Sequence, residues 1–359
     1  MCSPLEQAEK ERERVKEREK GEPCTRIPDI PLLVDVTSVF VLHDVHPSLI
    51  NNDILLFLKH GLSELAQRHL LNGWPTKDNI NLLCQRAAGL FVYAVATVKY
   101  LDQKFYLPDK QLETIVNFPD STGYEGEMSL DPLYLYILGG TFCVDDHAIF
   151  SRIQTIIGTL ILLVNPLPPS GIAELVGLET REILPILTSF QSLLILEEDP
   201  NEPVKPFHKS FPDFITNPSH CTDERFYISP KHLHLELVTN CLRVMNDGLE
   251  QNLLLLPNYA LNLEVEDLET RISTHISVAP QYACRSWHSH LVKPRGAVVD
   301  VISGLHTFLK EKYLAWLEVV SVLGAIRAGI SALEHLVSWL QEVPVYTQWH
   351  YLILTCAMN

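Results

Sequence analysis

Apolar residues recur every three to four positions along most of this chain, the spacing that places them on one face of an α-helix. One such stripe covers residues 54–65, and another covers residues 83–101 with Gly89 in its middle. The first helix is expected to begin near Asn52 or Asp53, because these side chains cap helix starts. A glycine inside a helix costs about 1 kcal/mol relative to alanine, so Gly89 is predicted to separate two helices.

Three helices are predicted in the middle of the chain. Residues 149–164 form a strongly apolar helical pattern that is followed by a proline-rich break. Two shorter helices are expected after it, with Ser170 and Thr180 as their N-caps. Gly177 is expected to end the first of these, because glycine adopts the left-handed conformation that commonly terminates helices.

A β-hairpin is predicted directly after these helices. Its strands are expected at residues 193–197 and 204–208, around a turn rich in Asp, Pro and Asn. Three helices followed by a two-stranded hairpin is the order of elements in a winged helix. The core of this unit is predicted to contain Phe190, Leu193, Leu194 and Phe207.

The expected fold class is mainly α, with an N-terminal helical region, a winged-helix domain carrying a small β-hairpin, and a C-terminal helical bundle or superhelical region. A β pattern at residues 33–45 precedes the first helix, and helical spacing resumes at His232. The expected organisation is a charged, disordered or lone-helical tail at 1–31, a strand and helices at 32–130, the winged helix at 131–217, a helical scaffold at 218–344, and an apolar tail at 345–359 that looks truncated.

Charge argues against a nucleic-acid partner. The 359 residues include 28 basic and 44 acidic side chains, which gives a formal net charge of −16. Residues 150–216, the core of the predicted winged helix, contain four basic residues and eight acidic ones. A surface that binds phosphates needs the opposite balance, so a DNA-binding winged helix is the weakest of the functional alternatives.

Cysteine usage and hydropathy predict a cytoplasmic protein. The eight cysteines contain no CxxC pair, which is typical of reduced thiols rather than of a disulfide framework. The longest apolar runs, residues 156–164 and 319–326, are far shorter than the ~20 residues that span a bilayer. No apolar stretch follows the charged N-terminus, so no signal peptide is expected.

Sequence motifs for catalysis or phosphate binding are missing from the chain. It contains no GxxxxGK[ST] loop, GxGxxG, GxSxG or HExxH. His208, Ser210 and Asp213 stand close together and could supply the base, nucleophile and orienting carboxylate of a hydrolase. The favoured interpretation is structural, with Ser210 as an N-cap and Asp213 in the first turn of a helix.

A second cluster could bind a metal. Cys284 and His288 are one helical turn apart, and His290 follows closely. A structural zinc site needs four ligands, and His290 points away from the other two on a helix. We therefore interpret the cluster as a half-buried cysteine with surface histidines.

Five segments of the chain are informative when taken together: LHDVHPSLINNDILLFL, LCQRAAGLFVYAVATVKYL, FQSLLILEED, VKPFHKSFPDFIT and QYACRSWHSHL. In this order they resemble fungal NACHT-type signalling NTPases, and the resemblance covers roughly residues 32–340. In this family a P-loop core is followed by a helical lid, a winged helix and a superhelical region. The resemblance implies that the chain corresponds to the back half of such a protein, with a remnant strand and the helical lid at 32–130, and that residues 33–42 are the last strand of the lost sheet.

The resemblance implies remnants of a nucleotide pocket. Gly89 and Phe91 occupy the place of a Gly-Leu-Pro-Leu turn that packs near the adenine, with Phe91 in place of the proline. His208 falls where the family's winged helix offers a histidine to the β-phosphate of ADP. Because the P-loop is missing, these contacts are expected to be vestigial, with ADP or ATP bound only if the missing half is supplied.

The function expected from these observations is a non-enzymatic regulatory and interaction module with protein partners, no bound cofactor, and no nucleic-acid or membrane partner. One alternative is a fragment of an active NTP-hydrolysing signalling protein whose P-loop half lies upstream. Another, from a different class, is a winged-helix DNA-binding regulator.

Overall fold

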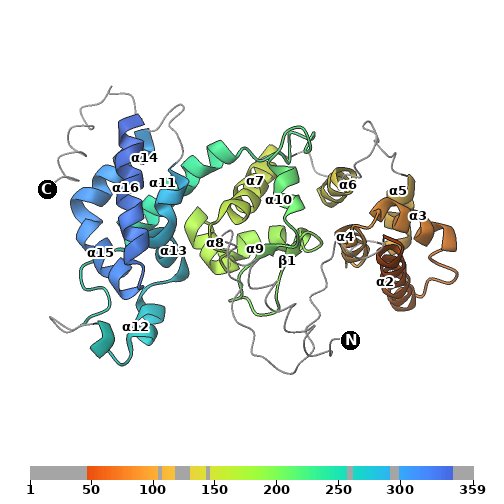
Figure 1. The fold of residues 1–359 in the computed structure, drawn as a ribbon, viewed down its shortest axis with the longest axis horizontal. Coiled ribbons are helices and arrows are strands. Elements are labelled where there is room, and N and C mark those ends of the chain that lie inside the picture. The colour runs from red at the N-terminus through yellow and green to blue at the C-terminus, as the bar shows by residue number, and fades with distance from the viewer. Residues whose placement is uncertain are drawn as a thin grey trace, which may run out of the picture. The chain divides into compact units, whose positions relative to one another are not determined.

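The computed structural model describes residues 47–103, 107–117, 130–142, 146–256, 262–291 and 299–342. Within these ranges the fold is mainly helical, with one small antiparallel sheet (Figure 1). The predicted strand at 33–45 and the two terminal tails lie outside the described residues. Among the helices that the structure describes, none combines the length and apolar character needed to cross a membrane.

The lid consists of four helices. Ile54, Leu58, Leu62 and Leu65 are fully buried along the first of them, which confirms the predicted stripe. This helix begins at Pro47, earlier than expected, because a proline in the first turn needs no hydrogen-bond acceptor for its nitrogen. The helices are α2 (Pro47–Arg68), α3 (Lys77–Ala87), α4 (Phe91–Leu101) and α5 (Pro108–Asn117).

Gly89 separates α3 from α4, as predicted. Its φ is 82°, and the preceding Ala88 is also left-handed, with a φ of 43°. A Cβ added to Gly89 would meet nothing within 4 Å, so backbone conformation rather than crowding explains the glycine.

The predicted order of three helices and a hairpin is confirmed. Helices α7 (His147–Leu162), α8 (Pro169–Val176) and α9 (Thr180–Ser189) precede the strands β1 (Leu194–Ile195) and β2 (Lys205–Pro206). The strands are antiparallel, with Leu194 opposite Pro206 and Ile195 opposite Lys205. Helix α6 (Asp131–Thr141) lies before this unit in the chain.

The predicted N-caps of α8 and α9 were wrong. Ser170 lies inside α8, whose N-cap position is Pro168, and Thr180 is the first residue of α9 rather than its cap. Glu179 caps α9, because its carboxylate and that of Glu182 exchange hydrogen bonds with backbone N–H groups in a capping box. Gly177 does end α8, with a φ of 73°.

The predicted winged-helix core is right for three of its four residues. Phe190, Leu193 and Leu194 are at most 2% exposed. Phe207 is only half-buried. Its ring lies under the Lys99 ammonium of α4, 4.4 Å from the ring centroid, so it faces the lid instead of the winged-helix interior.

The C-terminal scaffold is built around α11, which packs against α7, α8, α13 and α14. Helix α13 is followed directly by the 3-10 turn η3, and α15 ends at Val322, because Gly324 adopts a φ of 63°. The elements are α10 (Ser210–Ile215), α11 (Pro230–Gly248), η2 (Asn262–Glu264), α12 (Leu268–His275), α13 (Val278–Ser286), η3 (Trp287–His290), α14 (Val299–Thr307), η4 (Phe308–Lys312), α15 (Tyr313–Val322) and α16 (Ile326–Glu342).

Two contacts join α11 and α13 to the winged helix. The Arg243 guanidinium of α11 donates to the carbonyl oxygens of Glu174 and Leu175 at the end of α8, at 3.0 and 2.9 Å. The Tyr282 hydroxyl of α13 accepts a 3.1 Å hydrogen bond from the N–H of Val164, just beyond α7. The scaffold thus hydrogen-bonds to backbone groups at the end of α8 and just beyond the end of α7.

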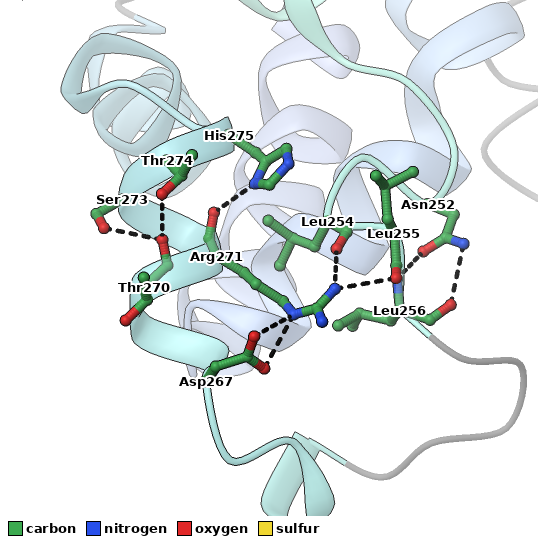
Figure 2. Close-up of polar contacts among 10 residues, drawn as sticks. All are labelled: Asn252, Leu254, Leu255, Leu256, Asp267, Thr270, Arg271, Ser273, Thr274 and His275. Atoms are coloured by element: carbon green, nitrogen blue, oxygen red, sulfur yellow. Dashed lines mark hydrogen bonds and ion pairs between the residues drawn. The ribbon is translucent and has the colours of Figure 1, made fainter.

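A polar network fixes the turn at residues 252–256, after the end of α11 (Figure 2). The Arg271 guanidinium donates to both carboxylate oxygens of Asp267 and to the carbonyl oxygens of Leu254 and Leu255. Asn252 closes the same turn by exchanging two hydrogen bonds with the backbone of Leu256. The arginine therefore satisfies carbonyl groups that have no place in a helix or sheet.

Candidate functional site

The candidate site lies where β2 ends and α10 begins. The N–H of Phe207 donates to the carbonyl of Leu193 at 2.9 Å, which continues the hairpin by one residue. The carbonyl of His208 then accepts from the N–H of Phe211 at 3.2 Å and starts the turn into α10. The exposed imidazole of His208 is therefore held between two elements with fixed backbones.

Hydrogen bonds assign the tautomer of His208. Its Nδ1 accepts from the backbone N–H of Ser210 at 3.2 Å, and the Ser210 Oγ lies 2.8 Å from the same nitrogen. Because a backbone N–H can only donate, Nδ1 is the acceptor, and the neutral ring carries its proton on Nε2. Among the described residues this Nε2–H has no hydrogen-bond partner, so it is available to an acceptor from outside.

A buried tyrosine completes the arrangement. The Tyr134 hydroxyl of α6 lies 2.7 Å from the Ser210 Oγ. Burial raises the pKa of Tyr134, although its hydrogen bond with Ser210 lowers it in part, so the phenol stays protonated and can donate. Because the Ser210 hydroxyl donates its own proton to the Nδ1 of His208, the Tyr134 hydroxyl is left as the donor to Ser210. The proton order is then Tyr134 O–H to Ser210 O–H to His208 Nδ1.

The expectation that Ser210 caps α10 was wrong. The position before the helix is Lys209, and the Ser210 hydroxyl turns toward His208 and Tyr134 instead of capping a backbone N–H. The structure also does not assemble a hydrolytic triad. Ser210 and His208 meet, but in the described part of the chain no hydrogen bond joins Asp213 to His208, and a triad needs its carboxylate on the second ring nitrogen.

Helix α6 is fastened to α10 and the turn after it. The Tyr134 ring lies 5.6 Å from the ring of Phe211 and 5.2 Å from that of Phe214, between centroids. The Asp131 carboxylate contacts the Nδ1 of His220 at 2.6 Å. These contacts position the hydroxyl that orients Ser210, and through it the imidazole.

Replacing Tyr134 with phenylalanine should lower the free energy of unfolding by about 1 kcal/mol, because it removes one hydrogen bond while the ring stays packed. A double-mutant cycle with Ser210→Ala isolates this term in urea denaturation. Tyr136→Phe is the matched control, since its hydroxyl donates to the Gln111 carbonyl elsewhere in the lid. Strictly additive effects of Tyr134→Phe and Ser210→Ala would contradict the coupling.

Helix α4 of the lid lies beside His208. Val92 and Ala96 line a shallow, open depression together with Phe207 and His208, and it encloses essentially no free volume. Ligand pockets commonly measure about 300–1,000 Å³, so this depression is too small to enclose a nucleotide. Burial lowers the pKa of Lys99, which stacks on Phe207, and the nearby Glu197 carboxylate partly offsets this effect.

The resemblance singled out Gly89, Phe91 and His208, and the structure does not bring these three residues together in one site. His208 lies at the depression. Phe91 instead packs on α2, with its ring 5.1 Å from that of Phe57, and Gly89 forms the turn before α4. Val92, one residue further along, is the side chain that α4 presents beside His208. Sequence reasoning placed Ser210 beside His208 but missed Val92 and Tyr134 as neighbours of this site.

The interpretation of the second cluster as a half-buried cysteine with surface histidines was wrong for both Cys284 and His290. His290 is fully buried, and Cys284 is only 1% exposed. The reason is that η3 turns more tightly than an α-helix, which carries His290 into the core. The described residues contain no group of three or more His, Cys, Asp or Glu that could hold a metal ion.

Both ring nitrogens of His290 are hydrogen-bonded. Its Nε2 lies 2.7 Å from the Tyr282 hydroxyl, and its Nδ1 lies 2.9 Å from the Nδ1 of His234 on α11. Tyr282 accepts from Val164 and stays protonated because burial raises its pKa, so it donates to His290. Burial, with smaller contributions from His234 and His288, lowers the pKa of His290 to about 3. The contact between His234 and His290, which are 56 residues apart, could not be predicted from any pattern in the sequence.

Comparison of the chain with family models, with curated proteins and with solved structures finds no match in any of the three. Function is therefore inferred from the chemistry of the site itself.

Proposed function

We propose that this chain is a non-catalytic regulatory and interaction module, corresponding to the lid and winged-helix half of a NACHT-type nucleotide switch. The observation that carries the proposal is the imidazole of His208, held at the end of the hairpin with an outward N–H donor beside the first turns of α4. A histidine held in this way can donate to a phosphate oxygen and so couple the winged helix to a nucleotide. In this proposal the chain works through protein partners.

The proposal excludes hydrolysis by the chain alone. Phosphoryl transfer depends on a phosphate-binding loop and a magnesium site, which supply most of the electrostatic stabilisation of the transition state. The printed sequence contains no GxxxxGK[ST] loop, and the depression beside His208 is smaller than a nucleotide pocket. A nucleotide enters the proposal only together with a P-loop module, which keeps open the alternative of a fragment of an active NTPase.

The paired charges of α9 count against the DNA-binding alternative. Arg181 lies 2.7 Å from the Glu179 carboxylate, and Arg152 of α7 lies 3.7 Å from that of Glu182. The third helix of a winged helix is the one that enters the major groove, and here its arginine side chain is matched by a carboxylate. Phosphates would have to displace these pairs against a chain of strongly negative net charge.

The thiols support a reducing, cytoplasmic compartment as part of the proposal. In the described part of the chain, Cys84, Cys221, Cys241 and Cys284 are all free. Burial raises the pKa of the Cys284 thiol to about 12, so it stays protonated and unreactive.

Calorimetry with ADP tests the proposal. The chain alone should show no binding at micromolar nucleotide, because one charge-assisted contact contributes only about 1.5–3 kcal/mol, which by itself corresponds to an affinity weaker than millimolar. Fusing a P-loop module upstream should create ADP binding that His208→Ala weakens by about 10-fold or more.

His232→Ala is the matched control, because His232 is an exposed histidine on α11 that pairs with Glu236. It should leave ADP binding to the fusion unchanged. Micromolar ADP affinity of the chain alone, or equal loss in both variants, would overturn the proposed role of His208.

A further inference from the structure

Helix α16 carries more apolar surface than its contact with the core uses. One stripe faces the scaffold and contains Gly329, Ala332, Leu336, Trp339 and Leu340, all buried. A second stripe contains Ile326 at 58% exposure, Ile330 at 55%, the half-buried Leu333, and Val337 at 40%.

The two stripes lie side by side on the helix. At about 100° per residue, the second stripe is turned by roughly 100° from the first, so that apolar side chains cover about half of the circumference. A helix that packs on one side needs an apolar face only ~100° wide. The second stripe therefore exceeds what packing within the scaffold requires.

The spacing of the second stripe matches a helix as its partner. Its residues follow one another at intervals of four, three and four, as the core positions of a coiled coil do. This order is the same when read backwards. A second α16 running antiparallel therefore stacks Ile326 against Val337 and Ile330 against Leu333 in four matched layers.

We propose that this stripe, Ile326, Ile330, Leu333 and Val337, docks a second copy of this chain, with the two α16 helices antiparallel across a two-fold axis. Such an interface is self-complementary, because each copy presents the same surface to the other. The proposal is independent of nucleotide binding.

Two charged side chains along one edge of the stripe favour a second copy of the chain as its partner. Arg327 and Glu334 are both exposed, and neither forms an ion pair within the described residues. In the antiparallel register, Arg327 of one copy and Glu334 of the other differ by only about two residues in height, roughly 3 Å along the axis. The two-fold axis makes two such pairs. A parallel pairing would instead place these charges opposite Gly329 and Leu336.

The contact is small. A standard interface buries about 800 Å² on each partner, and four layers of one helix pair supply less. Association is therefore expected to be reversible and to depend on protein concentration.

Sedimentation velocity of the full chain, from low micromolar to near-millimolar concentration, tests the proposal. The chain should shift from monomer to dimer as the concentration rises. Ile330→Glu should remain monomeric, because it places a charge at the centre of the stripe in both copies. Ser331→Glu, an exposed neighbour on the polar face, is the matched control and should dimerise as the unmodified chain does. Circular dichroism verifies that both variants stay folded.

Charge reversal tests the antiparallel register. Arg327→Glu and Glu334→Arg should each weaken dimerisation by up to about tenfold, because each replaces two attractive pairs by two repulsive ones. Combining both substitutions restores opposite charges across the axis and should recover the original dimerisation constant.

Three results would overturn the proposal. The first is a full chain that stays monomeric at every concentration. Self-association only of a chain that lacks residues 343–359 also counts against the proposal, because that segment would then be what covers the stripe. The second is a dimer that survives Ile330→Glu. The third is a double charge reversal that fails to recover dimerisation.

Discussion

Replacing Leu194 with aspartate should unfold the winged helix, with a loss of several kcal/mol in the free energy of unfolding. Leu194 is 1% exposed in β1, opposite Pro206, and its N–H donates to the carbonyl of Phe190 at 3.0 Å. Aspartate at this position buries a charge without a partner, which is among the most destabilising changes known for a single residue. Urea denaturation followed by circular dichroism measures the loss.

Leu184→Asp is the matched control for this experiment. Leu184 lies on α9 in the same unit and is 40% exposed, so the new carboxylate stays in water. Its effect should remain within about 0.5 kcal/mol. Equal unfolding midpoints for Leu194→Asp and the unmodified chain would show that β1 is not part of the core.

Acidification should destabilise the chain through His290. In the unfolded chain this histidine binds a proton below its ordinary pKa of 6.5, whereas in the fold it stays neutral down to a pKa of about 3. Between these two values the unfolded state binds more protons, so the free energy of unfolding falls as the pH falls. The slope contributed by one such group is at most about 1.4 kcal/mol per pH unit.

His290→Gln tests the source of this slope, because glutamine keeps a hydrogen-bonding side chain but cannot titrate. The variant should lose less stability between pH 6 and 4, although it starts from a lower value. Burial also lowers the pKa of His234, so part of the acid sensitivity should remain. Identical slopes for His290→Gln and the unmodified chain would exclude this origin.

Local patterns predicted the elements well where a single physical rule decides. The stripe from Ile54 to Leu65, the break at Gly89 and the end of α8 at Gly177 each depend on residues close in sequence. The helix starts were less predictable, because several residues compete for one cap. Glu179 rather than Thr180 is the N-cap of α9, because its carboxylate forms a capping box with Glu182 three residues later.

The candidate site was only partly predictable, because its partners are distant in the chain. His208 was singled out, but the hydroxyl of Tyr134 that orients Ser210 comes from 76 residues earlier. Phe207 was expected in the core from its alternation within the strand. It faces Lys99 instead, because β2 ends one residue before it and the lid supplies the contact. Such contacts follow from packing between units, which residue spacing does not encode.

The hydrogen bonds between the scaffold and the ends of α7 and α8 have a consequence for how movements are transmitted. Because Arg243 and Tyr282 bind backbone groups rather than flexible side chains, a rotation of α11 or α13 is expected to rotate the unit of α7, α8 and α9 with it. Helix α7 in turn packs against β2, two residues before His208. If a bound partner rotates the scaffold, the hairpin would thus move as a whole and displace the imidazole of His208.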